Sequence, residues 1–240
     1  MSDHLQELLS KSRDNRVEEL LQDSYFTELI KGIESPQENI KCIAGRSLAN
    51  LLRACPDAQT KALGNEFFRS EVVRMPPNLD SEWARIWMRL LFLLTIPYEG
   101  SVIVHSQLFQ SLVGDNVFRQ HNDVLVDLLR VLFNVKSHKL LSLDEDNLLI
   151  IFIECCLRDY PADLDVQGSC HNLLNIMDCP IGEGLLIQSL LFFLEKSDTS
   201  ADGNVLIYIP RVFQTAINAV KSNDDLRKQL RKLVFASTSV

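Results

Sequence analysis

A seven-residue pattern recurs along the chain at a nearly constant interval. The copies are RSLANLL from Arg46, RLLFLLT from Arg89, RVLFNVK from Arg130, HNLLNIM from His171 and RVFQTAI from Arg211. Successive copies begin 43, 41, 41 and 40 residues apart, an interval typical of armadillo and HEAT units of two or three helices. Because one such unit cannot bury its apolar face alone, neighbouring units stack. The sequence therefore predicts an all-α, armadillo- or HEAT-like superhelical solenoid of about five units.

The whole chain agrees with a single helical domain. It has 240 residues, of which 46% are hydrophobic, with only 9 glycines and 8 prolines, and this composition suits long helices joined by short turns. We expect residues 1–34 to form an N-terminal helical cap and residues 35–240 to form the repeats. We also expect a monomer.

Apolar residues recur at helical spacing almost everywhere. We expect a first helix near Asn15–Ile33, and a second that begins with Ser35 as its N-cap and Pro36 in its first turn. The segment Met75–Glu82 is the clearest loop because two adjacent prolines cannot continue a helix. Ser142–Glu145 is predicted to form a capping box that opens a later helix.

Two rows of residues follow from the repeat. The basic row consists of the residues that open the copies, Arg46, Arg89, Arg130, His171 and Arg211. The polar row consists of the polar residues four positions later, Asn50, Asn134, Asn175 and Thr215, and the second copy has a leucine there. A spacing of four places both rows on one helix face, and repetition predicts a ladder along a concave groove.

The ladder has a functional and a structural interpretation. An asparagine amide offers donors and an acceptor to an extended peptide backbone, and arginine or protonated histidine binds a carboxylate. Alternatively, the arginines are merely solvated and an asparagine ties the backbone of a neighbouring loop. Phe92 and Phe133, each three residues after an arginine of the row, either line the groove or pack inward. An acidic protein with a basic groove suggests capture of an acidic or C-terminal segment.

Charge and hydropathy restrict the partners and the compartment. The net charge of −8 argues against nucleic acid as the main partner, since phosphate binding needs a basic face. The chain has no run of 18 apolar residues, so we expect no membrane span. The polar N-terminus does not look like a signal peptide. Six cysteines in a large, non-secreted chain are usually reduced, so we expect a cytoplasmic protein.

We find no sequence motif for catalysis or for a cofactor. The chain has no G-x-x-x-x-G-K-[ST] phosphate loop, no H-E-x-x-H and no G-x-S-x-G. Cys170, His171 and Cys179 form the only cluster that suggests zinc, although zinc ligands are usually more closely paired. We therefore expect a non-enzymatic protein without metal or cofactor, with a zinc or thiol enzyme on this cluster as an alternative.

Five apolar segments of the chain have a distinctive sequence. The most specific is MRLLFLLT, Met88–Thr95, and the others are LLRVLFNV, Leu128–Val135, with IKCIAGRSLANLL, HNLLNIM and LLIQSLLFFLEKS. These segments resemble helices of the synembryn family, cytosolic chaperones and exchange factors for G-protein α subunits (Gα), and they follow the same order as in the family. The resemblance covers nearly the whole chain after the first helix.

The resemblance implies a right-handed superhelix whose concave surface receives the C-terminal helix of GDP-bound or nucleotide-free Gα. Holding that helix would promote GDP release and assist the folding of nascent Gα. The groove positions that it implies are Arg46, Asn50, Arg89, Phe92, Arg130, Phe133, Asn134, His171 and Asn175, while Arg211 and Thr215 come from the repeat alone. Family members continue with further repeats after the fifth copy. We therefore expect a short member, for which binding of Gα is better supported than exchange activity. The alternative is a generic armadillo scaffold that binds an unrelated acidic peptide without exchange activity.

Overall fold

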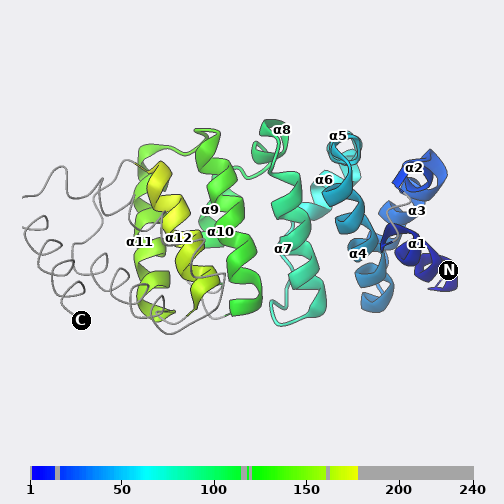
Figure 1. The fold of residues 1–240 in the computed structure, drawn as a ribbon, viewed down its shortest axis with the longest axis horizontal. Coiled ribbons are helices and arrows are strands. Elements are labelled where there is room, and N and C mark those ends of the chain that lie inside the picture. Colours follow the sequence, from blue (N-terminus) through cyan, green and yellow to red (C-terminus); the bar gives the residue numbers. More distant parts are fainter. Residues whose placement is uncertain (1, 14–16, 115–117, 119–120, 161–162, 178–240) are drawn as a thin grey trace, which may run out of the picture. The chain divides into compact units, whose positions relative to one another are not determined.

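A computed structural model of the chain describes residues 2–13, 17–114, 118, 121–160 and 163–177. These residues form helices joined by turns, with no strand among them (Figure 1), and the prediction of an all-α fold is confirmed for this part of the chain. No helix within it combines the length and the apolar character that a bilayer span requires. The chain divides into two compact units, Met1–Leu140 and Leu141–Val240, which are described separately.

The first unit contains ten helices within its described residues. They are α1 (Ser2–Arg13), α2 (Val17–Leu20), α3 (Asp23–Ile33), α4 (Glu38–Ala54), α5 (Pro56–Gly64), α6 (Glu66–Val72), α7 (Glu82–Leu94), α8 (Tyr98–Ser101), α9 (Ser106–Val113) and α10 (Asn122–Ser137). The helices α4, α7 and α10 carry the first three copies of the repeated pattern and run side by side (Figure 1). We call these three the central helices. In the second unit, α11 (Leu143–Asp159) packs against α12 (Leu164–Ile176).

The middle central helix, α7, buries side chains toward both of its neighbours. It packs against α4 and against α10, and Trp87, Leu90, Leu91 and Leu94 are at most 1% exposed. The indole nitrogen of Trp87 donates a hydrogen bond of 2.7 Å to the backbone carbonyl of Val72, so its single polar group is satisfied inside the core. A helix buried on two sides in this way holds successive repeats together.

Local sequence signals explain where several helices begin. The hydroxyl of Ser81 accepts a hydrogen bond from the backbone nitrogen of Ala84 and caps α7 directly after the double-proline loop. Ser142 and Glu145 form the predicted capping box at the start of α11. In that box the serine hydroxyl accepts from a backbone donor of the first turn, and the glutamate carboxylate accepts from the backbone nitrogen of the serine.

Three boundaries near the N-terminus differ from the sequence prediction. Within the predicted helical cap, the first helix is Ser2–Arg13, which precedes the helix expected near Asn15, and its apolar side chains are buried, with α1 packed against α4. The single helix expected over Asn15–Ile33 is divided between α2 and α3, where the Lys61 ammonium donates to the backbone carbonyl of Leu21 at 2.6 Å. The helix α4 begins at Glu38 rather than at Pro36, because Ser35 forms a turn by accepting from the backbone nitrogen two residues later.

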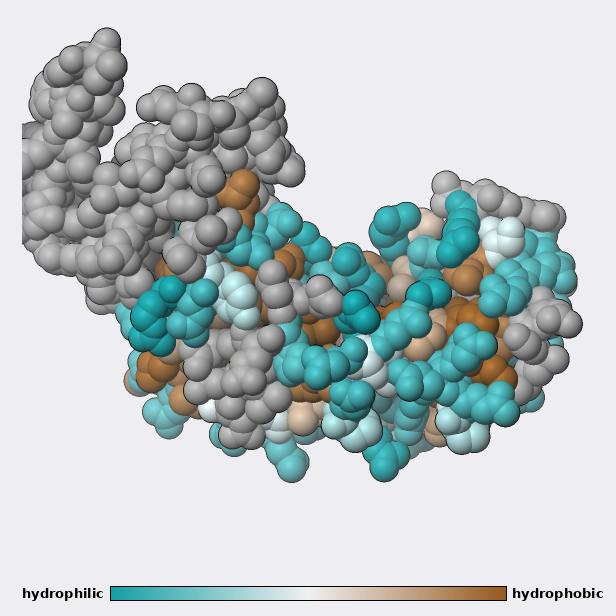
Figure 2. Space-filling model, turned by 90° about the horizontal axis from the view of Figure 1, so that it is seen from below, coloured by the Kyte–Doolittle hydropathy of each residue, from teal (hydrophilic) through white to brown (hydrophobic). Residues whose placement is uncertain are grey.

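The outer surface is consistent with helices that turn their apolar stripes inward. On the face shown in Figure 2, hydrophilic side chains predominate over the described residues and smaller hydrophobic areas lie between them. Such a distribution is the expected result of amphipathic helices packed around a common core.

The close approach of α4 to α7 depends on Gly45. A Cβ atom added there would lie 2.6 Å from Cγ2 of Ile86 and 2.9 Å from Cζ3 of Trp83, so we expect Gly45→Ala to lower the free energy of unfolding by about 1–3 kcal/mol. Gly64→Ala is the control, because nothing lies within 4 Å of the added atom, and it should raise stability by up to about 1 kcal/mol. Urea unfolding measures both, and equal effects would contradict the close approach.

Candidate functional site

The first three members of the basic row lie at matching places on the central helices. Arg46 is the ninth residue of α4, Arg89 the eighth of α7 and Arg130 the ninth of α10. Their side chains are 47%, 47% and 42% exposed. The regular offset in sequence has therefore become three half-exposed guanidinium groups, one on each neighbouring helix.

Each of these arginines is paired with an acid of its own chain. Arg46 forms an ion pair with Glu82 of α7. Arg89 Nε lies 2.8 Å from Asp127 Oδ2, and Arg130 Nη1 lies 3.0 Å from Asp127 Oδ1. The Asp127 side chain is only 9% exposed, so one buried carboxylate holds two arginines. The first two pairs connect an arginine to the next central helix along the chain.

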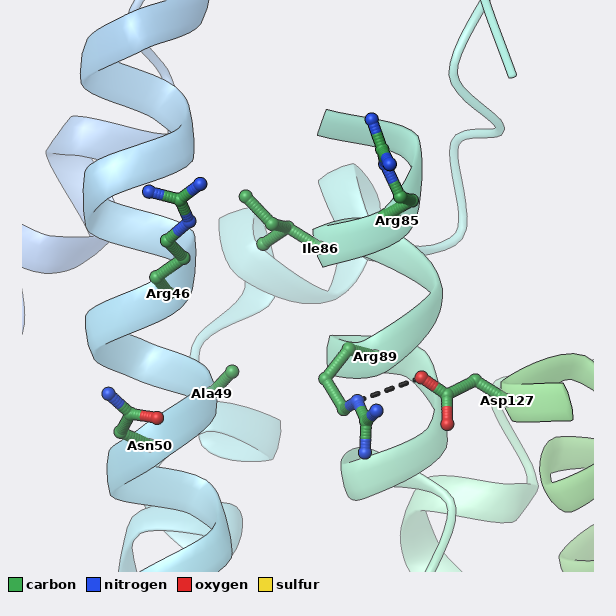
Figure 3. A pocket seen from close by; sticks show the side chains of 7 residues that line it. All are labelled: Arg46, Ala49, Asn50, Arg85, Ile86, Arg89 and Asp127. Carbon is green, nitrogen blue, oxygen red and sulfur yellow. Dashed lines mark ion pairs between the residues drawn. The ribbon is translucent and has the colours of Figure 1, made fainter. Parts of the chain in front are cut away.

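A groove between α4 and α7 collects part of this row. It has a volume of about 370 Å³ and is lined by Arg46, Ala49 and Asn50 of α4, by Arg85, Ile86 and Arg89 of α7, and by Asp127 of α10. Figure 3 shows Arg46, Ala49 and Asn50 on α4 and Ile86 directed toward α4 from α7, with Arg89 turned toward Asp127 on the α10 side. Three guanidinium groups and one carboxylate line the groove, which therefore has a basic character.

Two members of the polar row reach back to the preceding repeat. Asn50 Nδ2 donates to the hydroxyl of Ser12 at 3.1 Å, and Asn134 Nδ2 donates to the hydroxyl of Thr95 at 3.1 Å. Each hydroxyl donates in turn to the backbone carbonyl three residues earlier in the chain. These contacts match the structural interpretation of the asparagines. Among the described residues, neither amide oxygen accepts a hydrogen bond.

The same contact places α1 in register with the central helices. Thr95 follows Arg89 by six positions, and the residue six positions before Ser12 is Gln6, which precedes Arg46 by 40 residues. Gln6 is exposed. The segment expected to form an N-terminal cap thus begins with a helix that occupies the place of a repeat helix, without the arginine.

The aromatic candidates lie at the edge of the core. Phe92 and Phe133 are both half-buried. This burial lies between the two alternatives that the sequence left open, which were to line the groove or to pack inward. The guanidinium carbon of Arg130 lies 5.6 Å from the centre of the Phe92 ring. This cation–π contact and Asp127 hold the guanidinium group of Arg130 from two directions.

The fourth member of the basic row does not follow the first three. His171 lies on α12 and its side chain is fully buried, so the expectation that it presents a positive charge in the groove is wrong. Burial lowers the pKa of His171 to about 4, and the ring is neutral at pH 7. Asn175 also belongs to α12, while Arg211 and Thr215 lie outside the described residues.

Sequence reasoning missed three residues of the site. Glu82, Arg85 and Asp127 lie seven, four and three positions before an arginine of the basic row, respectively. These spacings place each of them on the same helix face as that arginine. The spacing could have identified them as neighbours of the row. It could not have shown that Glu82 and Asp127 pair with arginines of the preceding central helix.

The described part of the chain contains no group of three or more His, Cys, Asp or Glu side chains arranged to hold a metal ion. In the zinc alternative, Cys170 and His171 are both buried on α12, and Cys179 lies outside the described residues. Burial raises the pKa of the Cys170 thiol well above its ordinary value, which disfavours the thiolate that a zinc site needs.

Comparison with known proteins identifies the fold. No known protein family and no curated protein matches the sequence. A designed armadillo repeat protein matches with a TM-score of 0.65 and 12% identity over 91% of this chain and 92% of its own. The chain has an armadillo-like repeat fold.

Two further solved structures resemble this armadillo-like solenoid. A designed armadillo repeat protein in complex with the peptide (KR)4 matches with a TM-score of 0.62 and 13% identity, over 88% of this chain and 90% of that one. An engineered protein matches with a TM-score of 0.64 and 17% identity, over 90% of each chain. At these identities the likeness shows the fold alone.

The Asn134 contact predicts a measurable stabilisation. Asn134→Ala removes the donor to the fully buried Thr95 hydroxyl and should cost about 1–2 kcal/mol of unfolding free energy. A double-mutant cycle with Thr95→Val should give a coupling of about 0.5–1.5 kcal/mol. The exposed Asn39 of α4 provides the control, since Asn39→Ala should have little effect. Additive Asn134 and Thr95 effects would contradict the proposed tie.

His171 predicts a loss of stability in acid. The unfolded chain takes up a proton on this residue near pH 6.5, whereas the folded chain does so only near pH 4. Stability is therefore lost as the pH falls from 6.5 to 4, by about 3 kcal/mol in total. Urea unfolding of the wild type and of His171→Gln at pH 7 and pH 4.5 measures this loss. Identical pH dependence in the two proteins would show that His171 is not the group responsible.

Proposed function

We propose that this chain is a non-catalytic binding protein that captures an acidic segment of another protein. The observation that carries the proposal is the row of Arg46, Arg89 and Arg130, one half-exposed guanidinium group on each central helix. Guanidinium groups bind carboxylates through paired hydrogen bonds, and the groove beside them has room for a side chain.

The armadillo-like fold supports a peptide as the guest. A designed protein of this fold is in complex with the basic peptide (KR)4. In the present chain, the half-exposed arginines of the central helices favour an acidic guest instead. Charge complementarity selects a partner and speeds its encounter more than it adds affinity. An acidic chain with a basic groove is therefore suited to selective capture of an acidic segment.

As the specific partner we propose a Gα subunit, bound through its C-terminal helix in the GDP-bound or nucleotide-free state. The support is the resemblance of Met88–Thr95 and Leu128–Val135 to helices of the synembryn family. Those segments correspond to the second halves of α7 and of α10, the helices that carry Arg89 and Arg130. Withdrawal of the Gα helix would favour GDP release, and the same hold would assist the folding of nascent Gα.

Binding to Gα and its dependence on Arg130 test this function. The full chain should bind Gα and accelerate the release of labelled GDP from it. Arg130→Glu should weaken binding by about tenfold or more, because it replaces one of the three guanidinium groups of the row with a negative charge beside Asp127. Surface plasmon resonance measures the affinity, and the fluorescence of a GDP analogue measures release.

Arg69→Glu is the matched control for this experiment. Arg69 lies on α6, is exposed and has no ion pair among the described residues, so its reversal should leave Gα binding unchanged. Thermal unfolding of Arg130→Glu and Arg130→Gln separates lost binding from lost structure. If Gα binds in neither nucleotide state while acidic peptides from other proteins do bind, the chain is a generic armadillo scaffold and the Gα assignment is wrong.

A further inference from the structure

We infer that the groove between α4 and α7 selects a phosphorylated side chain of the guest over an ordinary carboxylate. This inference rests on the proposed function, because it specifies the chemistry of the acidic segment that the groove takes. Its basis is the charge balance of the groove, in which Arg46 and Arg89 already have carboxylate partners within the chain.

The existing pairs reduce what a single carboxylate can gain. Arg46 is paired with Glu82, and Arg89 is paired with Asp127. A guest carboxylate carries the same charge and the same two acceptor oxygens as these partners. It therefore either exchanges with one of them or binds a guanidinium group whose charge is already largely balanced. Ion pairs between half-exposed groups contribute little in either case.

A phosphate group does not need to displace either acid. Arginine has five N–H donors, of which Arg89 uses Nε for Asp127 and Arg46 uses Nη2 for Glu82. The remaining donors of both side chains are available to a second anion. A phosphorylated side chain carries a charge of about −1.5 to −2 and three acceptor oxygens. It can therefore bond to Arg46 and Arg89 together, which one carboxylate does less well.

The shape of the groove fits one such group. Its volume of about 370 Å³ is at the lower end of the range of about 300–1,000 Å³ found for ligand sites. Arg46 lines the groove from α4 and Arg89 lines it from α7, so both helices contribute a guanidinium group to the same lining. Figure 3 shows Arg89 turned toward Asp127. Arg85 also lines the groove, but it has an interaction of its own, and the inference rests on Arg46 and Arg89.

A phosphorylated protein segment fits these charges better than a nucleic acid does. The chain carries a net charge of −8, and a nucleic-acid backbone needs a series of uncompensated cations along its length. Within the described central helices, each arginine of the row is partly neutralised by Glu82 or Asp127. The site therefore matches a single strongly charged group on an otherwise ordinary peptide.

Three matched peptides test the inference on the full chain. They share one fluorescein-labelled sequence of glycine and glutamate and differ only at the central position, which is serine, glutamate or phosphoserine. Fluorescence anisotropy should show the phosphoserine peptide binding about tenfold more tightly than the glutamate peptide. Arg46→Gln and Arg89→Gln should each reduce this ratio to about twofold or less, while Arg69→Gln on α6 should leave it unchanged.

Two variants test the charge balance itself. Glu82→Gln releases Arg46 from its acid, and because Glu82 is 44% exposed the change should not disturb folding. It should strengthen binding of the glutamate peptide by about threefold. The preference for the phosphoserine peptide over the glutamate peptide should therefore become smaller. Asp127→Asn should act in the same direction on Arg89, with thermal unfolding as the check on this buried position. Weaker binding of the glutamate peptide to a folded Glu82→Gln protein would overturn the argument.

The remaining outcomes also decide the matter. Equal binding of the glutamate and phosphoserine peptides to the wild type would overturn the inference, as would a preference that survives both arginine substitutions. Displacement of the phosphoserine peptide by a single-stranded oligonucleotide at equal concentration would assign the site to nucleic acid instead. If Gα binds as proposed and the peptides bind alike, only the phosphate assignment fails. If the phosphoserine preference holds and Gα does not bind, only the Gα assignment fails.

Discussion

The packing of α7 between α4 and α10 is the contact on which the rest of the first unit depends. A repeat of two or three short helices exposes apolar faces that it cannot cover itself, and α7 covers those of two neighbours at once. Gly45 allows α4 to approach so closely that a methyl group would overlap Ile86. Because the apolar faces are used up between the helices, the surface of each central helix that remains exposed is free to carry charge.

Polar contacts then fix the order of the helices along the unit. Asparagines of the polar row reach back to a hydroxyl of the preceding repeat, and Arg46 and Arg89 reach forward to an acid of the next one. At the junction of α4 and α7, the positions equivalent to the hydroxyl and the asparagine are Leu52 and Leu93, both buried. At this junction, leucines therefore occupy both positions that hold a hydroxyl and an asparagine at the other junctions. The residues that form these ties are also the ones proposed to contact a guest, and each tie leaves other donors and acceptors of the same side chains open.

The repeat interval alone was sufficient to predict the fold, since the spacing of Arg46, Arg89 and Arg130 reports the size of one stacked unit. The structure places these three side chains, all half-exposed, at matching positions of the central helices. The repeat interval could not predict the burial of His171, because the same position in a repeat is exposed or buried according to what packs against it. Nor could it predict the acids that pair with the row. Glu82 lies near Arg46 only because of the stagger between two packed helices, which no spacing within one helix determines.

Asp127 is the residue at which stability and binding make competing demands. Its carboxylate is 9% exposed and holds two guanidinium groups. Removing a partner from a buried charge costs much more than an exposed pair is worth, so Arg89 and Arg130 cannot both leave Asp127 to follow a guest. The guest must instead add itself to an ion-pair cluster that stays intact. This requirement favours a guest group with many acceptors and a high charge. It also explains how a basic row on a chain of net charge −8 can avoid binding acidic surfaces in general.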